Sequence, residues 1–551
     1  MFIFFLFVSS KLSLNDFELM AKTSIAACVI ISVYAVFQFI GLDFIDWYPK
    51  EIAGSRPIGT LGNPIFLANF IAVIAPWSIY YYFKEKRFVY TLAYIVSIVV
   101  LCAALYLTFC RSGFLAFVVS LGLMFFLKRD WFKNLKTDGR SNILKLLILF
   151  FLLISIPVFI QNTAINKKTN KLIEEKIYTP VKAKDVNIST RVYLWKSAVN
   201  LAMDAPFTGH GPDVLPFVYT KYRYMEPVEI RGRIKAPAHV HNQILEYAVI
   251  GGIPLFVIVL LIIFIFFKDC FKTIFKNNEG KDILILITSG AVSYWVGNLF
   301  VFSGISIDIL WYAFMGFLVI AAGRRVVIKT GSKHVLIALF LLAVVVFNFY
   351  YSLKLWTADY HYKSGLRFSA RKNYVKAIDE FNKSMKINPY KSVYMEKKAK
   401  ELEGLYTLTK DPVFYYGSKN SYLQALEVNA LNSYAWADLG RLSACAGNLK
   451  ESLDYYLQAL KLDPYNPVIL SDLATTLYNA GKRKPAESYY LESLSIYPYS
   501  SLTSKNLGML YSDEGNYEKA RIYLLKALEY EPDPEKKQKL GKIIIELDAK
   551  K

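Results

Sequence analysis

Four polar clusters in this sequence stand beside long apolar runs, and arginine and histidine dominate them. They are Arg56 with the Gly59–Pro64 stretch after it, Cys110-Arg111-Ser112-Gly113, Arg191, and His241-Asn242. Arginine binds phosphate oxygens through paired hydrogen bonds and keeps its charge at every physiological pH. Three guanidinium groups and an imidazole facing one cavity would therefore suit a diphosphate.

Arg111 carries the strongest physical argument, because it stands in a very short turn between two apolar runs. A charge at that depth in a membrane is costly unless something anionic meets it. Simpler interpretations remain open for each arginine. Arg56 and Arg111 can extend to lipid phosphates, as arginines at helix ends commonly do, and Arg191 can lie on a solvated helix face.

The histidines and two carboxylates allow several roles. His241 can act in catalysis or merely cap a helix, and Glu246 and Asp308 are secondary candidates, as an arginine partner and an acceptor-side carboxylate respectively. His239 and His241 with His210 form an alternative zinc set. No Cys, Asp or Glu stands at ligand spacing beside them, so we expect no metal and no cofactor.

These residues must be positioned by membrane helices. The chain has 551 residues, 54% of them hydrophobic and 16% aromatic, and its mean hydropathy is +0.31. We expect an all-α, polytopic helix bundle with about nine to ten spans of the length that crosses a bilayer. The predicted spans lie near 23–41, 65–83, 88–107, 112–127, 143–160, 243–267, 282–302, 307–321 and 335–352.

Lysine and arginine concentrate in alternate loops, which predicts the orientation. The basic loops form the cytoplasmic set, and the outer set comprises 42–64, the tip near 108–111, the large loop 161–242 and the 303–306 turn. All four polar clusters therefore face outward. The net charge of +21 adds little, since basic cytoplasmic loops already account for such an excess.

The large outer loop shows local order. Ser189 or Thr190 is predicted to cap a helix that ends at Asp204, and Thr208–Pro212 is predicted to form a tight turn. Tyrosines alternate with Lys and Arg over 219–233, a pattern that also occurs in single-strand nucleic-acid binding. On an outer membrane face it favours sugars or lipid headgroups, and we expect no nucleic acid.

The chain ends carry little chemistry. Met1–Val8 is apolar with no basic segment or cleavage site, which is untypical of a signal peptide; it resembles the tail of a membrane helix, and we expect the gene start to lie upstream. The cysteines form no CxxC pair, so the sequence predicts neither a disulfide framework nor a zinc ribbon.

From about residue 353 the sequence becomes polar and repetitive. Pro464, Pro498 and Pro532 are 34 residues apart, as are the glycines at 447, 481 and 515. This is the period of the tetratricopeptide repeat (TPR), a helical hairpin that stacks into a solenoid. About five repeats are expected over 353–551, including a degenerate repeat near 397–430. The domain offers no catalytic constellation and is predicted to bind proteins on the outer face.

The clusters together resemble the O-antigen ligase and O-antigen polymerase superfamily of bacterial membrane glycosyltransferases, which includes the protein O-oligosaccharyltransferases. The resemblance covers about 20–350. Its motifs are Gly59-Thr60-Leu61-Gly62-Asn63-Pro64, Arg111-Ser112-Gly113, Arg191-Val192-Tyr193-Leu194-Trp195, Gly209-His210-Gly211, His241-Asn242 with Leu245 and Glu246, and Gly251-Gly252-Ile253-Pro254.

The resemblance implies metal-independent glycan transfer from an undecaprenyl-diphosphate carrier to an acceptor glycan, lipid or protein. The transfer takes place on the outer face of the bacterial cytoplasmic (inner) membrane, in a GT-C-like fold. Arg56, Arg111 and Arg191 would bind the diphosphate, and Arg191 and His241 would be catalytic. Asn242 joins the secondary candidates. Membrane lipid and a protein held by the repeats are further expected partners.

Two alternatives remain at this point. A surface-polysaccharide polymerase would use the same carrier with another acceptor. A non-catalytic membrane-anchored TPR scaffold or a transporter belongs to a different class, and a transporter would place polar or helix-breaking residues deep within paired spans. The polar clusters gather at the outer mouth instead, which favours an enzyme in 1–352 with its outer loop at 161–242.

Overall fold

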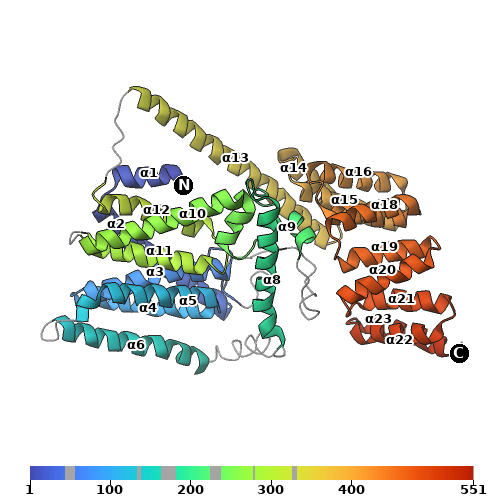
Figure 1. The fold of residues 1–551 in the computed structure, drawn as a ribbon, viewed down its shortest axis with the longest axis horizontal. Coiled ribbons are helices and arrows are strands. Elements are labelled where there is room, and N and C mark those ends of the chain that lie inside the picture. The colour runs from blue at the N-terminus through green and yellow to red at the C-terminus, as the bar shows by residue number, and fades with distance from the viewer. Residues whose placement is uncertain are drawn as a thin grey trace. The chain divides into compact units, whose positions relative to one another are not determined.

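The computed structural model describes residues 1–43, 56–132, 138–162, 182–223, 237–276, 280–324 and 332–549, and every regular element in these residues is a helix. The all-α fold class is confirmed. The helices form two compact units (Figure 1). Met1–Pro212 and His239–Lys329 make up the membrane unit, and Asp213–Ala238 and Thr330–Lys551 make up the repeat unit. Part of the large outer loop thus belongs with the repeats.

Each predicted span coincides with a helix. These helices are α2 (Leu14–Ile40), α3 (Pro64–Lys84), α4 (Phe88–Leu107), α5 (Arg111–Leu127), α6 (Asp138–Asn162), α10 (Gln243–Lys276), α11 (Lys281–Asn298), α12 (Ile305–Ala321) and, in the repeat unit, α13 (Ser332–Ala370). By length and composition, α2, α3, α4, α10 and the Leu339–Ala370 part of α13 can cross a membrane; α5, α6 and α12 contain shorter apolar stretches. The short 3-10 helix η1 (Arg129–Phe132) follows α5.

The first residues form a separate helix, α1 (Phe2–Lys11), which ends before Ser13 begins the turn into α2. It packs against α12, where Gly316 has no side chain and Val8 occupies the space. A Cβ at Gly316 would lie 2.6 Å from the Val8 side chain. The N-terminal apolar run is therefore a docked helix within the bundle.

The membrane unit is built around α3. Most of the apolar stretch of α3 is buried, and α11 is buried along nearly its whole length. In contrast α10 exposes a broad apolar surface that includes Leu261, Phe264 and Ile265. An apolar surface of that kind is what a lipid-facing helix presents. The outer helices thus enclose a packed centre from which the loops carrying the polar clusters emerge.

The outer-loop helix α8 (Lys182–Asp204) starts earlier than the sequence predicts. Ser189 and Thr190 lie inside it, so the prediction that one of them caps its start is wrong. Residues 182–188 contain no proline or glycine, so nothing in the sequence stops the helix from starting before Ser189. Its predicted end at Asp204 is confirmed.

The repeat unit contains five helical hairpins and a terminal helix. The hairpins pair α13 with α14 (Tyr374–Ile387), α15 (Ser392–Thr409) with α16 (Pro412–Val428), α17 (Ser433–Cys445) with α18 (Leu449–Leu462), α19 (Pro467–Asn479) with α20 (Arg483–Ile496), and α21 (Ser501–Asp513) with α22 (Tyr517–Tyr530), before α23 (Pro534–Asp548). The last apolar span and the first repeat helix are one unbroken helix, α13.

The repeat period has a direct structural cause. Gly440 and Gly508 stand where the two helices of a hairpin touch, and a Cβ there would lie 2.9 Å from Tyr456 and 2.8 Å from Leu524 respectively. Gly447, Gly481 and Gly515 all have positive φ, of 81°, 75° and 74°. They occupy the turn between the two helices, a conformation that favours glycine.

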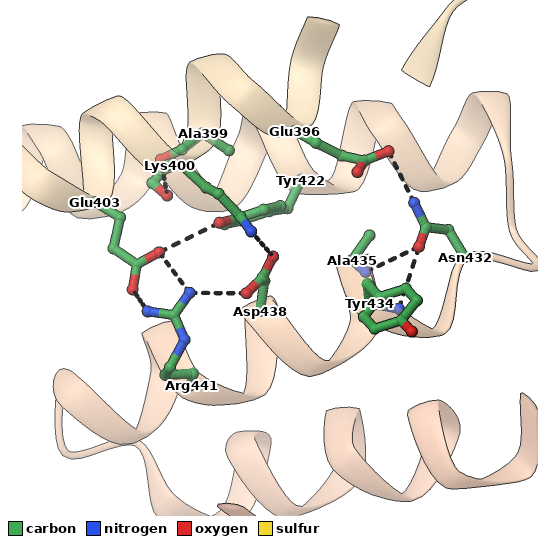
Figure 2. Close-up of polar contacts among 11 residues, drawn as sticks. Glu396, Ala399, Lys400, Glu403, Tyr422, Asn432, Tyr434, Ala435, Asp438 and Arg441 are labelled. Atoms are coloured by element: carbon green, nitrogen blue, oxygen red, sulfur yellow. Dashed lines mark hydrogen bonds and ion pairs between the residues drawn. The ribbon is translucent and has the colours of Figure 1, made fainter. Parts of the chain in front are cut away.

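A charged cluster joins the second and third hairpins (Figure 2). The Arg441 guanidinium of α17 pairs with Glu403 of α15 and, at 2.8 Å, with Asp438. Lys400 lies 3.1 Å from the second oxygen of Asp438, and the Tyr422 hydroxyl donates to Glu403 at 3.2 Å. This arginine is fully matched by the protein's own carboxylates, which marks the cluster as structural.

Candidate functional site

Arg56 and Arg191 both lie within electrostatic range of the Cys110 side chain. Arg56 precedes α3, Arg191 lies on α8, and the Cys110 side chain interacts electrostatically with both guanidiniums. Cys110 is buried, whereas both arginines are half-buried. The Nε of Arg56 donates to the carbonyl oxygen of Thr108 at 2.6 Å. That bond fixes Arg56 at the turn between α4 and α5 without using its two terminal nitrogens.

Both arginines lie in surroundings that disfavour their charge. Burial lowers the pKa of both guanidiniums, with the Cys110 thiol acting in the opposite direction. In the part of the chain that the structure describes, no carboxylate forms an ion pair with either of them. Cys110 also precedes the first turn of α5, and the free amides and dipole of a helix start favour negative charge.

Arg111 differs from the other two arginines. It is the first residue of α5, and its side chain is exposed. Gly113 explains why the turn before it is so short: a Cβ at Gly113 would lie 2.7 Å from the Cβ of Ala68, so its absence lets α5 approach α3. Cys110, the residue before Arg111, is buried, and the sequence alone gives no sign of that burial.

Phe302 organises the histidine side of the site. Its ring stacks on His239 at 3.8 Å between centroids and lies 5.8 Å from the His241 ring. On another side it meets Phe66 of α3 edge-on at 5.3 Å. His241 itself has a positive φ of 56°, a costly conformation for a residue other than glycine. The chain is thus bent sharply at the residue where α10 is about to begin.

Glu246 and Asn242 hold this bend in place. The Glu246 carboxylate meets His239 Nδ1 at 3.0 Å and accepts the Val240 amide at 2.8 Å. Among the described contacts the charged partner of Glu246 is His239, and no arginine pairs with it there. The Asn242 side chain accepts the amides of Ile244 and Leu245 at 3.0 and 3.1 Å and caps α10. Glu246 and Asn242 thus hold the backbone on either side of His241.

The predicted glycine turn locks α8 onto α10. The backbone at Gly251 and Gly252 is non-helical and interrupts α10. The Thr208–Pro212 turn packs against this interruption. The His210 amide donates to the Val249 carbonyl at 2.8 Å, and the Gly211 amide donates to the Ile250 carbonyl at 2.9 Å. A Cβ on Gly209 would lie 2.3 Å from the Ile250 carbonyl oxygen. These glycines therefore serve packing, and they fix the end of the helix that carries Arg191.

Asp308 belongs to a separate polar group at the start of α12. Its carboxylate accepts hydrogen bonds from the Tyr294 hydroxyl, at 2.8 Å, and from the Ser303 hydroxyl. The Ser303 amide donates to the Gln243 side chain at 2.7 Å, which ties this turn to the start of α10. Asp308 thus supports the 303–306 turn beside Phe302. Within the described residues no group of His, Cys, Asp or Glu has the proximity needed to hold a metal ion.

Parts of this chain match known protein families. Residues 96–260 match the O-antigen ligase family, and three segments match tetratricopeptide repeat families, at 433–466, 468–497 and 506–534. The chain carries an O-antigen ligase domain followed by C-terminal TPR repeats. The match supports an enzyme of the O-antigen ligase or polymerase type in an integral membrane protein. It spans Cys110, Arg111, Arg191 and His241, and stops short of Arg56.

Individual relatives are distant. A protein of Haemophilus influenzae with no assigned activity is 26% identical over 315 residues, which cover 54% of this chain and 71% of that protein. Pseudomonas aeruginosa pilF is 17% identical, covers 36% of this chain and 89% of its own, and has a TM-score of 0.31. The type IV pilus biogenesis factor PilW is 18% identical, with coverages of 35% and 86% and a TM-score of 0.31.

Proposed function

We propose that this protein transfers a glycan from an undecaprenyl-diphosphate carrier to an acceptor on the outer face of the bacterial cytoplasmic membrane. The observation that carries the proposal is the arginine pair around Cys110, at the start of α5. Both guanidiniums are half-buried and have no carboxylate partner among the described residues, which suits them to bind a diphosphate. The O-antigen ligase match over 96–260 supports the same class of reaction.

The reaction needs charge stabilisation on the donor side and proton removal on the acceptor side. The acceptor oxygen forms a bond to the anomeric carbon, the bond from that carbon to the diphosphate oxygen breaks, and the diphosphate leaves with the electron pair. Arg56 and Arg191 stabilise the charge that grows on it. His241 takes the hydroxyl proton, since the arginines already serve the donor.

The orientation is part of the proposal. The large loop is expected outside from the distribution of basic residues. Within the repeat unit, Thr220 of that loop is hydrogen-bonded to Leu462 of α18, and two groups in contact must lie on one side of a membrane. This contact supports an outward TPR array. A reporter fused after Tyr351 tests it, and a cytoplasmic signal there would overturn the orientation.

Gene deletion with complementation tests the activity. We expect that Arg191→Ala and His241→Ala fail to restore surface glycan, while Lys196→Ala, an exposed cation on the same helix, restores it. Arg191→Lys keeps the charge but loses the paired hydrogen bonds, so it should restore glycan only in part. Full restoration by both alanine variants would refute the assigned site.

The carrier-linked pool separates the two glycan-transfer candidates. If full-length glycan accumulates on the carrier in the deletion strain, the protein is a ligase or protein glycosylase. If only long chains disappear, it is a polymerase that extends glycan on its own carrier. If neither pool changes, the chain is not a glycosyltransferase and the scaffold alternative stands.

A further inference from the structure

A short part of the outer loop packs against the third TPR hairpin. It comprises α9 (Leu215–Val218) and η2 (Tyr219–Tyr222) and ends at Arg223. We call Asp213–Arg223 the docking segment, and it belongs to the same compact unit as the repeats. The Thr220 hydroxyl donates to the Leu462 carbonyl of α18 at 2.8 Å. Thr220 is buried, and so is the preceding Tyr219.

The docking point is the C-terminal end of α18. The last carbonyls of a helix have no partner within the helix and carry partial negative charge. Thr220 supplies a hydrogen bond to one of them, Leu462. Asp463, the next residue, is fully buried, and its carboxylate accepts a bond from Asn466 at 2.9 Å. Burial raises the pKa of Asp463, and the nearby positive charge of Arg223 opposes that rise.

The other repeats provide an internal comparison. The residue that caps the second helix of each hairpin is Asn388, Asn429, Asp463, Tyr497 or Glu531 in turn. All of these lie in the described part of the chain. Asp463 is the buried member of the set, whereas the other four are partly exposed. The third hairpin is thus distinguished at the position where the docking segment sits, by the burial of its capping carboxylate and by the nearby cation Arg223.

We propose that the TPR array binds the protein's own outer loop at the α18 end and thereby positions the site. The docking segment follows α8, which carries Arg191, and precedes His241 in the chain. Fixing it limits how far the two loop ends can move relative to the membrane helices. The repeats then act as a holder for the catalytic loop. The docking stands on its own contacts, while its effect on transfer rests on the proposed function.

Amide hydrogen exchange on the full-length protein in nanodiscs tests the docking. Thr220→Val and Arg223→Glu change only the loop, so they cannot unfold the repeats. We expect exchange of the docking segment to accelerate roughly tenfold or more in each, as local opening becomes easier. Glu531→Lys, at the equivalent position of the last complete hairpin, is the control and should leave it unchanged. Unaltered exchange in both loop variants would refute the docking.

The charge pair has its own test. Asp463→Lys should release the segment, and combining it with Arg223→Glu should restore much of the protection by reversing both charges. If the double variant is as unprotected as the sum of the singles, Arg223 and Asp463 do not interact and the proposed recognition is wrong.

Glycan-transfer assays on the same variants show whether the docking positions the site or has no effect on transfer. If the array positions the site, transfer falls in the variants that lose protection and recovers in the charge-reversed double variant. Lost protection with unchanged transfer would overturn the positioning role while leaving the docking and the proposed function intact. An inactive wild-type protein would instead refute the proposed function, and the exchange data would still report on the docking.

Discussion

Arg441 in the repeat unit and Arg191 in the membrane unit are both partly buried, yet their surroundings are opposite. Burial alone would lower the pKa of Arg441, but Glu403 and Asp438 outweigh it and raise the pKa. Burial does lower the pKa of Arg191, where a thiol is the opposing neighbour. An arginine matched by carboxylates holds a fold together. Arg191 has no carboxylate partner among the described residues, and our proposal assigns an outside anion to it.

The largest expected effect is on activity at Arg191. Arg191→Ala should reduce transfer by roughly a hundredfold or more, because it removes charge stabilisation of the leaving group. Its thermal unfolding temperature should stay the same or rise, since an unmatched buried charge is lost. Transfer assays and melting curves on one preparation check both. A large drop in melting temperature would make Arg191 a structural residue like Arg441.

Arg441→Ala should show the reverse pattern in the repeats. It leaves Glu403 without its cation, and breaking a fully buried pair costs about 3–5 kcal/mol. The Arg441 side chain is 41% exposed and that of Glu403 10% exposed, so we expect about 2–3 kcal/mol here. Hydrogen exchange in α15 and α17 measures it. No change in exchange would show that the cluster contributes nothing to stability.

Asp472, near Arg441, is expected to make the stability of the repeats depend on pH. Burial raises its pKa from 3.8 to about 6, with Arg441 opposing and Asp438 adding to the rise. Between these values the folded state keeps a proton that the unfolded state has lost, so stability falls as pH rises from about 4 to about 6. Asp472→Asn should flatten this dependence and stabilise the repeats by about 2 kcal/mol at pH 7. Exchange in α19 across this range tests it, and an unchanged slope would contradict it.

The smallest effect is expected at Arg521, which forms an exposed ion pair with Asp548 at 3.0 Å. Arg521→Ala should cost less than about 1 kcal/mol, because exposed pairs gain little in water. The same melting experiments provide the value. If Arg521→Ala lowered the free energy of unfolding as much as Arg441→Ala does, burial would not determine how much these arginines stabilise the repeats.

The sequence predicted the helices well because length and apolar character define a span directly, as in α3 and α4. It also predicted the TPR hairpins, since the small residues Gly440, Ala474 and Gly508 recur every 34 residues. It missed contacts that depend on tertiary approach. Glu246 meets His239 of its own turn, and Cys110 interacts electrostatically with two arginines from distant segments. Neither pairing leaves a local pattern, because each depends on how the chain bends.

Because α13 is continuous, its length determines how the repeats are rotated about the helix axis relative to its apolar stretch. An α-helix turns by about 100° for each residue, and α13 runs without interruption from its apolar stretch into the first hairpin. Inserting a single residue midway would therefore swing every binding surface of the array around the helix axis by roughly that angle. A seven-residue insertion would nearly restore the direction while lengthening the stalk by about 10 Å. The spacing within α13 therefore sets the direction in which the repeats face.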